Sequence, residues 1–252
     1  MGEFDIKTYT SENEKAARNN LVKLFKNSPL PDDQILSNLG LYLNSKTLSR
    51  ILFMNHLYSN IVNLQGVAIE FGCHWGQNLS LFSALRGIYE PFNRHRKIIG
   101  FDTFTGFSSI DLKDGGSDLM REGNLLLPSE YDDYLREILK AQEADNPLSH
   151  IPKFEVIKGD ASITFNKYLE DHPETIIALA YFDFDIYKPT RDCLRMIKSR
   201  LVRGSVVGFD ELNDPDSPGE TVALMEEIGL NKIKLMRFPI TSRTSYFIYE
   251  GN

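Results

Sequence analysis

The segment Val67-Ala-Ile-Glu-Phe-Gly-Cys-His-Trp-Gly76 carries the clearest pattern in the chain. Its first three residues are apolar, as in a buried strand, and Gly72 and Gly76 mark a turn before a helix expected over residues 77–86. Glycine adopts backbone angles closed to other residues and lets a ligand approach the main chain closely. The free N–H groups at the start of the helix would point at whatever the turn binds. We therefore predict a ligand site at this turn.

The turn excludes two common nucleotide-binding motifs. A dinucleotide-binding G-x-G-x-x-G would need glycines where the chain has His74 and Gln77, and no Gly-Lys-Ser/Thr follows as it would in a P-loop. The remaining pattern, Glu70-x-Gly72-x-x-x-Gly76, resembles the first motif of S-adenosylmethionine-dependent methyltransferases. A strand–turn–helix unit whose glycines serve packing alone is the alternative that this motif leaves open.

Composition limits the class of protein. The 252 residues, 42% of them hydrophobic, suffice for one large α/β domain, and a net charge of −7 argues against a nucleic-acid partner. Cys73 and Cys193 are the only cysteines, and their spacing suggests neither zinc nor a disulfide framework. No apolar run approaches the roughly 20 residues of a membrane span. We expect a cytoplasmic protein with reduced thiols and no membrane partner.

Two further strands are expected to end near acidic residues. Residues 97–102 form a strand that ends at Asp102, the place where nucleotide-binding α/β folds have an acid that binds ribose hydroxyls. Residues 154–158 form another strand, which leaves through Gly-Asp160-Ala161. Both strand ends would face the same crevice as the glycine turn.

A cluster of carboxylates is expected at the same edge of the sheet. The continuous apolar run 176–182 suits a central parallel strand and precedes Asp183 and Asp185, and the strand at 205–209 precedes Asp210 and Glu211. Acids two positions apart on an extended segment point to one side, where they repel each other unless a cation is present. Hard oxygen ligands without Cys or His favour magnesium over zinc. Singly, each acid could instead be a solvated cap or loop residue.

Several motifs together resemble a known family. They are Asp102-Thr-Phe-Thr-Gly-Phe107, Ala180-Tyr-Phe-Asp-Phe-Asp-Ile-Tyr187, Gly204-Ser-Val-Val-Gly-Phe-Asp-Glu211 and Pro218-Gly-Glu220. This set is similar to the macrocin O-methyltransferase family, and most similar to its members that methylate deoxysugars in antibiotic biosynthesis. The resemblance covers about residues 30–228.

The resemblance implies a set of site residues. It places S-adenosylmethionine against Glu70, Gly72, Gly76, Asp102 and Thr103, with Asp160 and Ala161 beside the adenine. It also implies Mg²⁺ on Asp183, Asp210 and Glu211, with Asp185 as the base. The chain departs from the family where Glu211 replaces an aspartate, which bears on metal binding, and where Ser205 replaces a glycine.

The expected reaction is methyl transfer from S-adenosylmethionine to a hydroxyl of a sugar or nucleotide-sugar, a small polar acceptor. Other acceptors remain open: a phosphorylated or phosphoramidate-type group on a surface polysaccharide precursor, or a catechol-like phenol. A Mg-dependent hydrolase on an α/β fold would leave the glycine motif and Asp102 without a role. A non-catalytic nucleotide-binding subunit would leave the four clustered acids unexplained.

The expected architecture is a Rossmann-like class I methyltransferase fold. We predict a seven-stranded, mostly parallel sheet with a C-terminal antiparallel hairpin formed by residues 232–236 and 244–249. Residues 1–62 would be a helical extension packed on the domain, with helices at 12–27 and 45–62. The methyltransferase domain would span 63–252, with an inserted, lid-like segment at about 108–150 that contains a helix at 129–144. The spare N-terminal helices and the resemblance favour a homo-oligomer.

Overall fold

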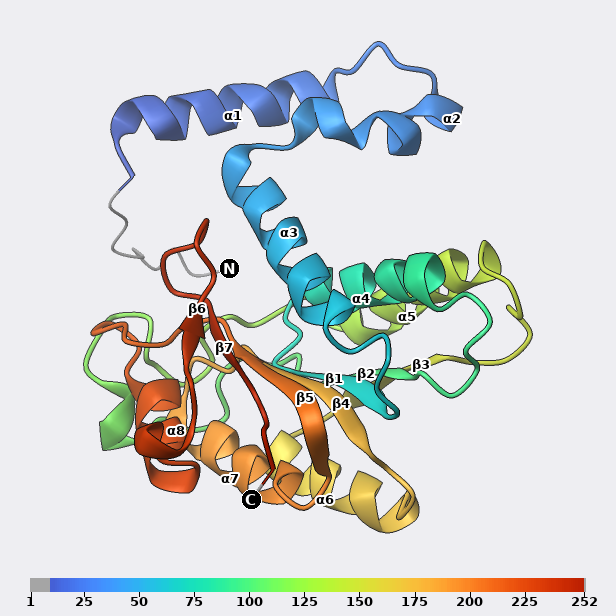
Figure 1. Cartoon of the computed structure of the whole chain (residues 1–252). Coiled ribbons are helices and arrows are strands. Elements are labelled where there is room, and N and C mark those ends of the chain that lie inside the picture. The colour runs from blue at the N-terminus through green and yellow to red at the C-terminus, as the bar shows by residue number, and fades with distance from the viewer. Residues whose placement is uncertain (1–9, 252) are drawn as a thin grey trace.

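The computed structural model describes residues 10–251, which form a seven-stranded sheet between two layers of helices (Figure 1). The strands follow the order β3-β2-β1-β4-β5-β7-β6, and only β7 runs antiparallel to its two neighbours. Their bounds are β1 Val67–Phe71, β2 Ile98–Asp102, β3 Phe154–Lys158, β4 Ile177–Phe182, β5 Leu201–Phe209, β6 Met236–Arg237 and β7 Ser245–Ile248. The predicted Rossmann-like class I methyltransferase fold, with seven strands and an antiparallel C-terminal end, is confirmed.

Helices cover both faces of the sheet (Figure 1). One face carries α3 (Ser45–Ser59), α4 (Gln77–Tyr89) and α5 (Tyr131–Ala144), and the other carries α6 (Ala161–Asp171), α7 (Tyr187–Ile197) and α8 (Gly219–Glu227). Because β1 and β4 lie inside the sheet under both layers, all their side chains are buried, which explains their unbroken apolar sequences. Glu70 of β1 is the only charged residue in these two strands.

A row of stacked phenylalanine rings crosses the sheet beneath the ends of its strands. The ring centroids of Phe71 lie 5.6 Å from Phe101 and 4.9 Å from Phe182. Phe182 in turn lies 5.3 Å from Phe209, and Phe209 lies 6.4 Å from Phe247. These five side chains are buried in the core on the side of α6, α7 and α8. Offset aromatic contacts of this kind hold neighbouring strands in register.

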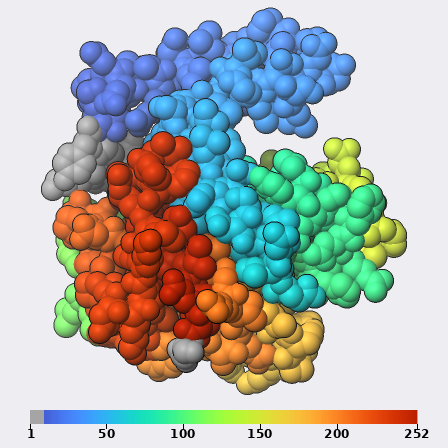
Figure 2. All heavy atoms as spheres, in the orientation of Figure 1, coloured from blue at the N-terminus to red at the C-terminus, as the bar shows by residue number. Residues whose placement is uncertain are grey.

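The N-terminal helices differ in how they pack. Helix α1 (Glu12–Lys26) begins with a capping box at Ser11 but buries none of its residues, and with α2 (Asp32–Ile35) and η1 (Leu36–Tyr42) it stands apart from the sheet (Figures 1 and 2). Helix α3, by contrast, packs on α4 and buries four of its side chains. Within residues 10–62, α3 is thus the part anchored to the domain. A homo-oligomer formed through the exposed helices stays a prediction.

Two segments differ from the sequence-based expectation. Residues 131–144 of the expected insertion form α5, which is the regular crossover helix between β2 and β3, so the additional chain is the shorter loop that contains η2 (Leu112–Asp114). The C-terminal strand expected at 232–236 is reduced to β6, because Gly229 adopts a φ of 85° and the chain then turns through η3 (Leu230–Lys232). Among residues 10–251, no helix has the length and apolar character needed to cross a bilayer.

Substituting Gly72 tests the packing of the central strands. Gly72 has a φ of 88°, and a Cβ added there would lie 2.1 Å from the carbonyl oxygen of Asp183. Because this oxygen belongs to the backbone, it cannot move aside cheaply, and Gly72→Ala should destabilise the protein by about 3 kcal/mol or more. Gly116→Ala is the control, since no atom lies within 4 Å of its added Cβ. Thermal unfolding should show a clear drop for the first variant, and equal melting temperatures would contradict this account.

The buried carboxyl group of Glu70 should make stability depend on pH. Burial raises the pKa of this group from 4.5 to about 8. The folded protein therefore keeps the proton while the unfolded chain loses it above about pH 4.5, so stability falls as pH rises from about 4.5 to 8. Glu70→Gln removes this dependence. Between pH 5 and pH 8, the free energy of unfolding of this variant relative to the wild type should rise by roughly 1 kcal/mol or more. This change would appear as a rise of a few °C in its relative melting temperature. A difference that stays constant with pH would refute the assignment.

Candidate active site

A cavity of about 540 Å³, partly open to solvent, lies at the carboxyl ends of the parallel strands. Loops that follow β1, β2, β3 and β4 form its walls, as expected for a ligand site in an open α/β sheet. Of the predicted site residues, those that line it are Gly72, Asp102, Thr103, Asp160, Ala161, Asp183 and Asp185. The structure thus brings most of the predicted cofactor residues to one place.

Asp102 ties two of these loops together. Its carboxylate accepts the backbone N–H of His74 at 2.8 Å and that of Phe104 at 2.6 Å. Thr103 donates its hydroxyl to the carbonyl of Gly106 at 2.8 Å, which closes the tight turn after β2. This side of the cavity is therefore fixed before any ligand binds, and the Asp102 carboxylate remains on its surface.

A helix start and apolar side chains belong to the same lining. Asp160 caps α6 by accepting the N–H of Ser162 at 2.9 Å, and Ala161 is the first residue of that helix. Phe107 and Leu125, from the loop after β2, add apolar surface to the same cavity. Apolar side chains with polar groups beside them suit an aromatic heterocycle.

Two predicted cofactor residues lie outside this lining. Glu70 is fully buried in β1, and Gly76 precedes α4 with a φ of 75°. A Cβ at Gly76 would lie 2.3 Å from the side chain of Leu135 on α5, so this glycine permits helix packing. At Gly72 the close neighbour is likewise protein, the backbone of Asp183. That these glycines let a ligand approach the main chain stays a prediction, and of the two only Gly72 lines the cavity.

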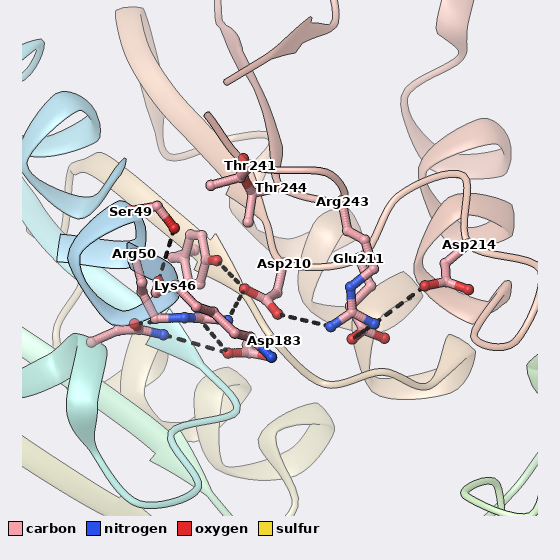
Figure 3. Close-up of polar contacts among 12 residues, drawn as sticks. Lys46, Ser49, Arg50, Asp183, Asp210, Glu211, Asp214, Thr241, Arg243 and Thr244 are labelled. Carbon is pink, nitrogen blue, oxygen red and sulfur yellow. Dashed lines mark hydrogen bonds and ion pairs between the residues drawn. The ribbon is translucent and has the colours of Figure 1, made fainter. Parts of the chain in front are cut away.

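Beside the cavity, Asp210 and Asp183 share a positive partner, Arg50 of α3 (Figure 3). The Oδ1 atom of Asp210 accepts the hydroxyl of Tyr181 at 2.7 Å and lies 2.7 Å from Nη2 of Arg50. The Oδ2 atom of Asp183 lies 3.7 Å from Nη1 of Arg50 and accepts the side-chain amide of Asn78 at 3.4 Å. The two carboxylates thus come from adjacent strand ends and meet one guanidinium group.

Glu211 has a different partner, Arg243, from the loop before β7 (Figure 3). Nη1 of Arg243 lies 2.5 Å from Glu211 and 3.2 Å from Asp214, and Nη2 lies 3.9 Å from Asp210. The other oxygen of Glu211, Oε2, is buried and receives no hydrogen bond from the residues that the structure describes. Each end of the chain therefore supplies one arginine to the acid cluster.

Asp185 is buried and lines the cavity. Burial, followed by the negative charge of Glu211, raises its pKa well above the ordinary value. The segment is not extended as expected, because Asp185 adopts a φ of 61°. Asp183 consequently faces Arg50, whereas the strongest charged neighbour of Asp185 is Glu211. A raised pKa makes this group a stronger proton acceptor once it is deprotonated, which is the property that a general base needs.

The predicted metal ligands have the oxygen atoms that magnesium prefers, but their side chains are not arranged around one metal position. Asp183, Asp210 and Glu211 offer hard oxygen atoms, and the buried Oε2 of Glu211 has no donor. Within residues 10–251, however, no three His, Cys, Asp or Glu side chains are grouped as a metal site. Guanidinium groups hold these carboxylates instead, so an ion could join them only if at least one arginine moved.

Two arginines of the site, Arg50 and Arg243, were not predicted from the sequence. No motif marks either of them. Both come from segments far along the chain from Asp183, so only the folded arrangement brings them to the acids. A basic residue within an otherwise amphipathic helix is the one signal that the sequence offered for Arg50.

Comparison with known proteins identifies the family of the chain. A scan against protein-family models gives no match, and no curated protein matches in sequence. Among solved structures, the crystal structure of CalS11, a calicheamicin methyltransferase, is 36% identical over 99% of both chains with a TM-score of 0.94. An apo structure of CalS11, described as a TDP-rhamnose 3'-O-methyltransferase of calicheamicin biosynthesis, is 36% identical over 96% of both chains with a TM-score of 0.86.

A more distant match has the same fold. The structure of the O-methyltransferase NovP is 18% identical over 80% of both chains, with a TM-score of 0.60. At that identity the likeness concerns the fold alone, whereas the likeness to CalS11 extends along almost the whole chain. The chain therefore belongs to the family of S-adenosylmethionine-dependent O-methyltransferases that includes CalS11, as its resemblance to the macrocin O-methyltransferases implied.

Proposed function

We propose that this protein transfers a methyl group from S-adenosylmethionine to a hydroxyl group of a sugar carried by a nucleoside diphosphate. The observation that carries the proposal is the full-length similarity to CalS11, which is described as acting on TDP-rhamnose. The polar, acid-lined end of the cavity supports it, because such a surface suits a hydroxylated acceptor better than an apolar one.

In this proposal the cavity would hold the cofactor at one end and the acceptor at the other. Asp102 would accept hydrogen bonds from the ribose hydroxyls, and Asp160 and Ala161 would lie beside the adenine. The methionine part would then run past Gly72 toward Asp183 and Asp185, where the acceptor hydroxyl would meet the sulfonium methyl group. Holding these two groups in line is a large part of what the protein contributes.

Asp185 would act as the general base. In the proposed step the acceptor oxygen forms a bond to the methyl carbon, the carbon–sulfur bond breaks, and S-adenosylhomocysteine leaves. The proton of the acceptor hydroxyl passes to the carboxylate of Asp185. The hydrogen bond from the N–H of Phe184 to Glu220, at 2.9 Å, holds the segment that carries Asp185 in place.

Magnesium is part of the proposal as a bound cofactor. Asp183, Asp210 and Glu211 would hold the ion, whose charge would lower the pKa of the acceptor hydroxyl. Support comes from the type of their oxygen atoms and from the unpaired Oε2 of Glu211. The longer side chain of Glu211, in place of the aspartate expected from the resemblance, would be accommodated by the release of Arg243.

The acceptor can be tested directly. Purified protein would be given labelled S-adenosylmethionine with TDP-rhamnose, with free rhamnose, and with a phosphorylated polysaccharide precursor, and products would be identified by mass spectrometry and NMR. We expect methylation of the nucleotide-sugar. Methylation of the phosphorylated precursor alone would support that acceptor instead, and no transfer despite tight binding of S-adenosylhomocysteine would overturn the sugar assignment.

Replacing the proposed base separates catalysis from cofactor binding. Asp185→Asn should lower kcat by about 100-fold or more, since general bases commonly contribute that much. Its affinity for S-adenosylhomocysteine, measured by calorimetry, should change less than about threefold, because the amide keeps the shape of the side chain. Asp133→Asn is the control and should keep normal kcat, since Asp133 is exposed on α5 and lies outside the cavity lining. Normal turnover by the Asp185 variant would remove this residue from the base role.

Removal of magnesium should affect turnover and leave cofactor binding unchanged. We expect a chelator to abolish methyl transfer and added Mg²⁺ to restore it, because the ion is proposed to contact the acceptor. Calorimetric titration with S-adenosylhomocysteine should give the same affinity with and without chelator. Full activity in chelator would show that the paired arginine side chains suffice and would withdraw the metal from the mechanism.

A further inference from the structure

Arg50 is brought to the acid cluster by the packing of α3. One turn further along the helix, Phe53 is fully buried with its ring centroid 6.2 Å from that of Tyr181 in β4. Leu57 is buried on the same face. This packing fixes the position of α3 on the sheet, so the side chain of Arg50 reaches the strand ends with little freedom (Figure 3).

The contacts of Arg50 fix the orientation of two carboxylates at once. Its guanidinium group lies 2.7 Å from Oδ1 of Asp210 and 3.7 Å from Oδ2 of Asp183. Tyr181 donates to the same oxygen of Asp210, and Asn78 donates to the same oxygen of Asp183. In each acid, therefore, one oxygen is held by a neutral donor and by Arg50, and the second oxygen of Asp210 lies 3.9 Å from Arg243.

Charge gives this arrangement its importance. Asp183 and Asp210 lie close together at the ends of adjacent strands, where they would repel each other and turn apart without a cation between them. Arg50 is mostly shielded from water, with 28% of its side chain exposed, whereas Arg243 is 46% exposed and contacts Glu211 and Asp214. Arg50 is thus the inner and more constrained of the two arginines.

We propose that Arg50 is a positioning residue of the methyl-transfer site, which holds Asp183 and Asp210 in the orientation that the reaction requires. It makes α3, from the N-terminal segment, part of the active site. The inference rests on the proposed function, because the reaction is the one proposed above. Its chemical requirement is specific: a planar group with several N–H donors can bridge two carboxylates, whereas a lysine ammonium group acts as a single point charge.

The test compares Arg50→Ala and Arg50→Lys with the wild type. We expect Arg50→Ala to lower kcat by about 10- to 100-fold, as loss of a supporting contact to an active-site ligand commonly does, while KM for S-adenosylmethionine changes less than about threefold. Guanidinium ion in the millimolar range should recover part of the lost kcat, since it can occupy the vacated space. Arg50→Lys should lie between the two, because it keeps the charge and loses the bridge.

Lys46→Ala is the matched control. Lys46 is exposed one turn earlier on the same helix, so this variant removes a positive charge from α3 without touching the carboxylates. It should behave as the wild type. A folded Arg50→Ala protein with normal kcat would overturn the proposal, as would a loss of kcat that guanidinium ion cannot restore and that is accompanied by weaker binding of S-adenosylhomocysteine.

A second readout does not need the acceptor. Crystal structures of Arg50→Ala and Arg50→Lys should show Asp183 and Asp210 turned away from their wild-type orientations while the sheet stays unchanged. If the wild type methylates none of the acceptors offered, the proposed function fails, and these structures still decide whether Arg50 orients the two carboxylates. Unchanged carboxylates in both variants would refute the positioning role.

Discussion

The stacked phenylalanine row beneath the strand ends is the packing interaction on which the site depends. Four of these rings come immediately before a residue of the site. Gly72 follows Phe71, Asp102 follows Phe101, Asp183 follows Phe182 and Asp210 follows Phe209. Offset aromatic pairs contribute roughly 0.5–1.5 kcal/mol each beyond the burial of their surface. Because the rings lock the strands in register, Gly72, Asp102, Asp183 and Asp210 emerge side by side at one edge of the sheet.

That edge concentrates negative charge, and two arginine side chains from distant parts of the chain neutralise it. Arg50 comes from the helix before β1, and Arg243 comes from the loop before the last strand. Burying carboxylates without partners would cost several kcal/mol per ion, so the sheet alone could not hold this cluster in its ionised form. Helix α3 and the loop before β7 therefore belong to the site as much as the central strands do.

The loop after β2 is held to the domain by several contacts. Lys113 donates to the hydroxyl of Tyr187 at 2.9 Å and to Glu226 at 2.6 Å, and Asp114 accepts the N–H of Tyr187 at 2.5 Å. Phe107 packs with Met120 and Ile186 in a small apolar cluster of its own. Any opening of this loop over the cavity would have to break these contacts with α7 and α8, and its action as a lid stays a prediction.

The sequence by itself determined the fold class and the acidic part of the cavity lining. Apolar runs that end in glycine or acid are local features, and the rule that parallel strands end at one edge places Asp102, Asp160 and Asp183 together without knowledge of any contact. Tertiary structure alone decided what the acids contact, because the φ of 61° at Asp185 turns it toward Glu211. It also decided the role of Gly76, where the side chain of Leu135 leaves no room for a Cβ. Arg50 and Arg243 could not be placed from the sequence, because their roles depend on contacts between segments far apart in the chain, which no local pattern encodes.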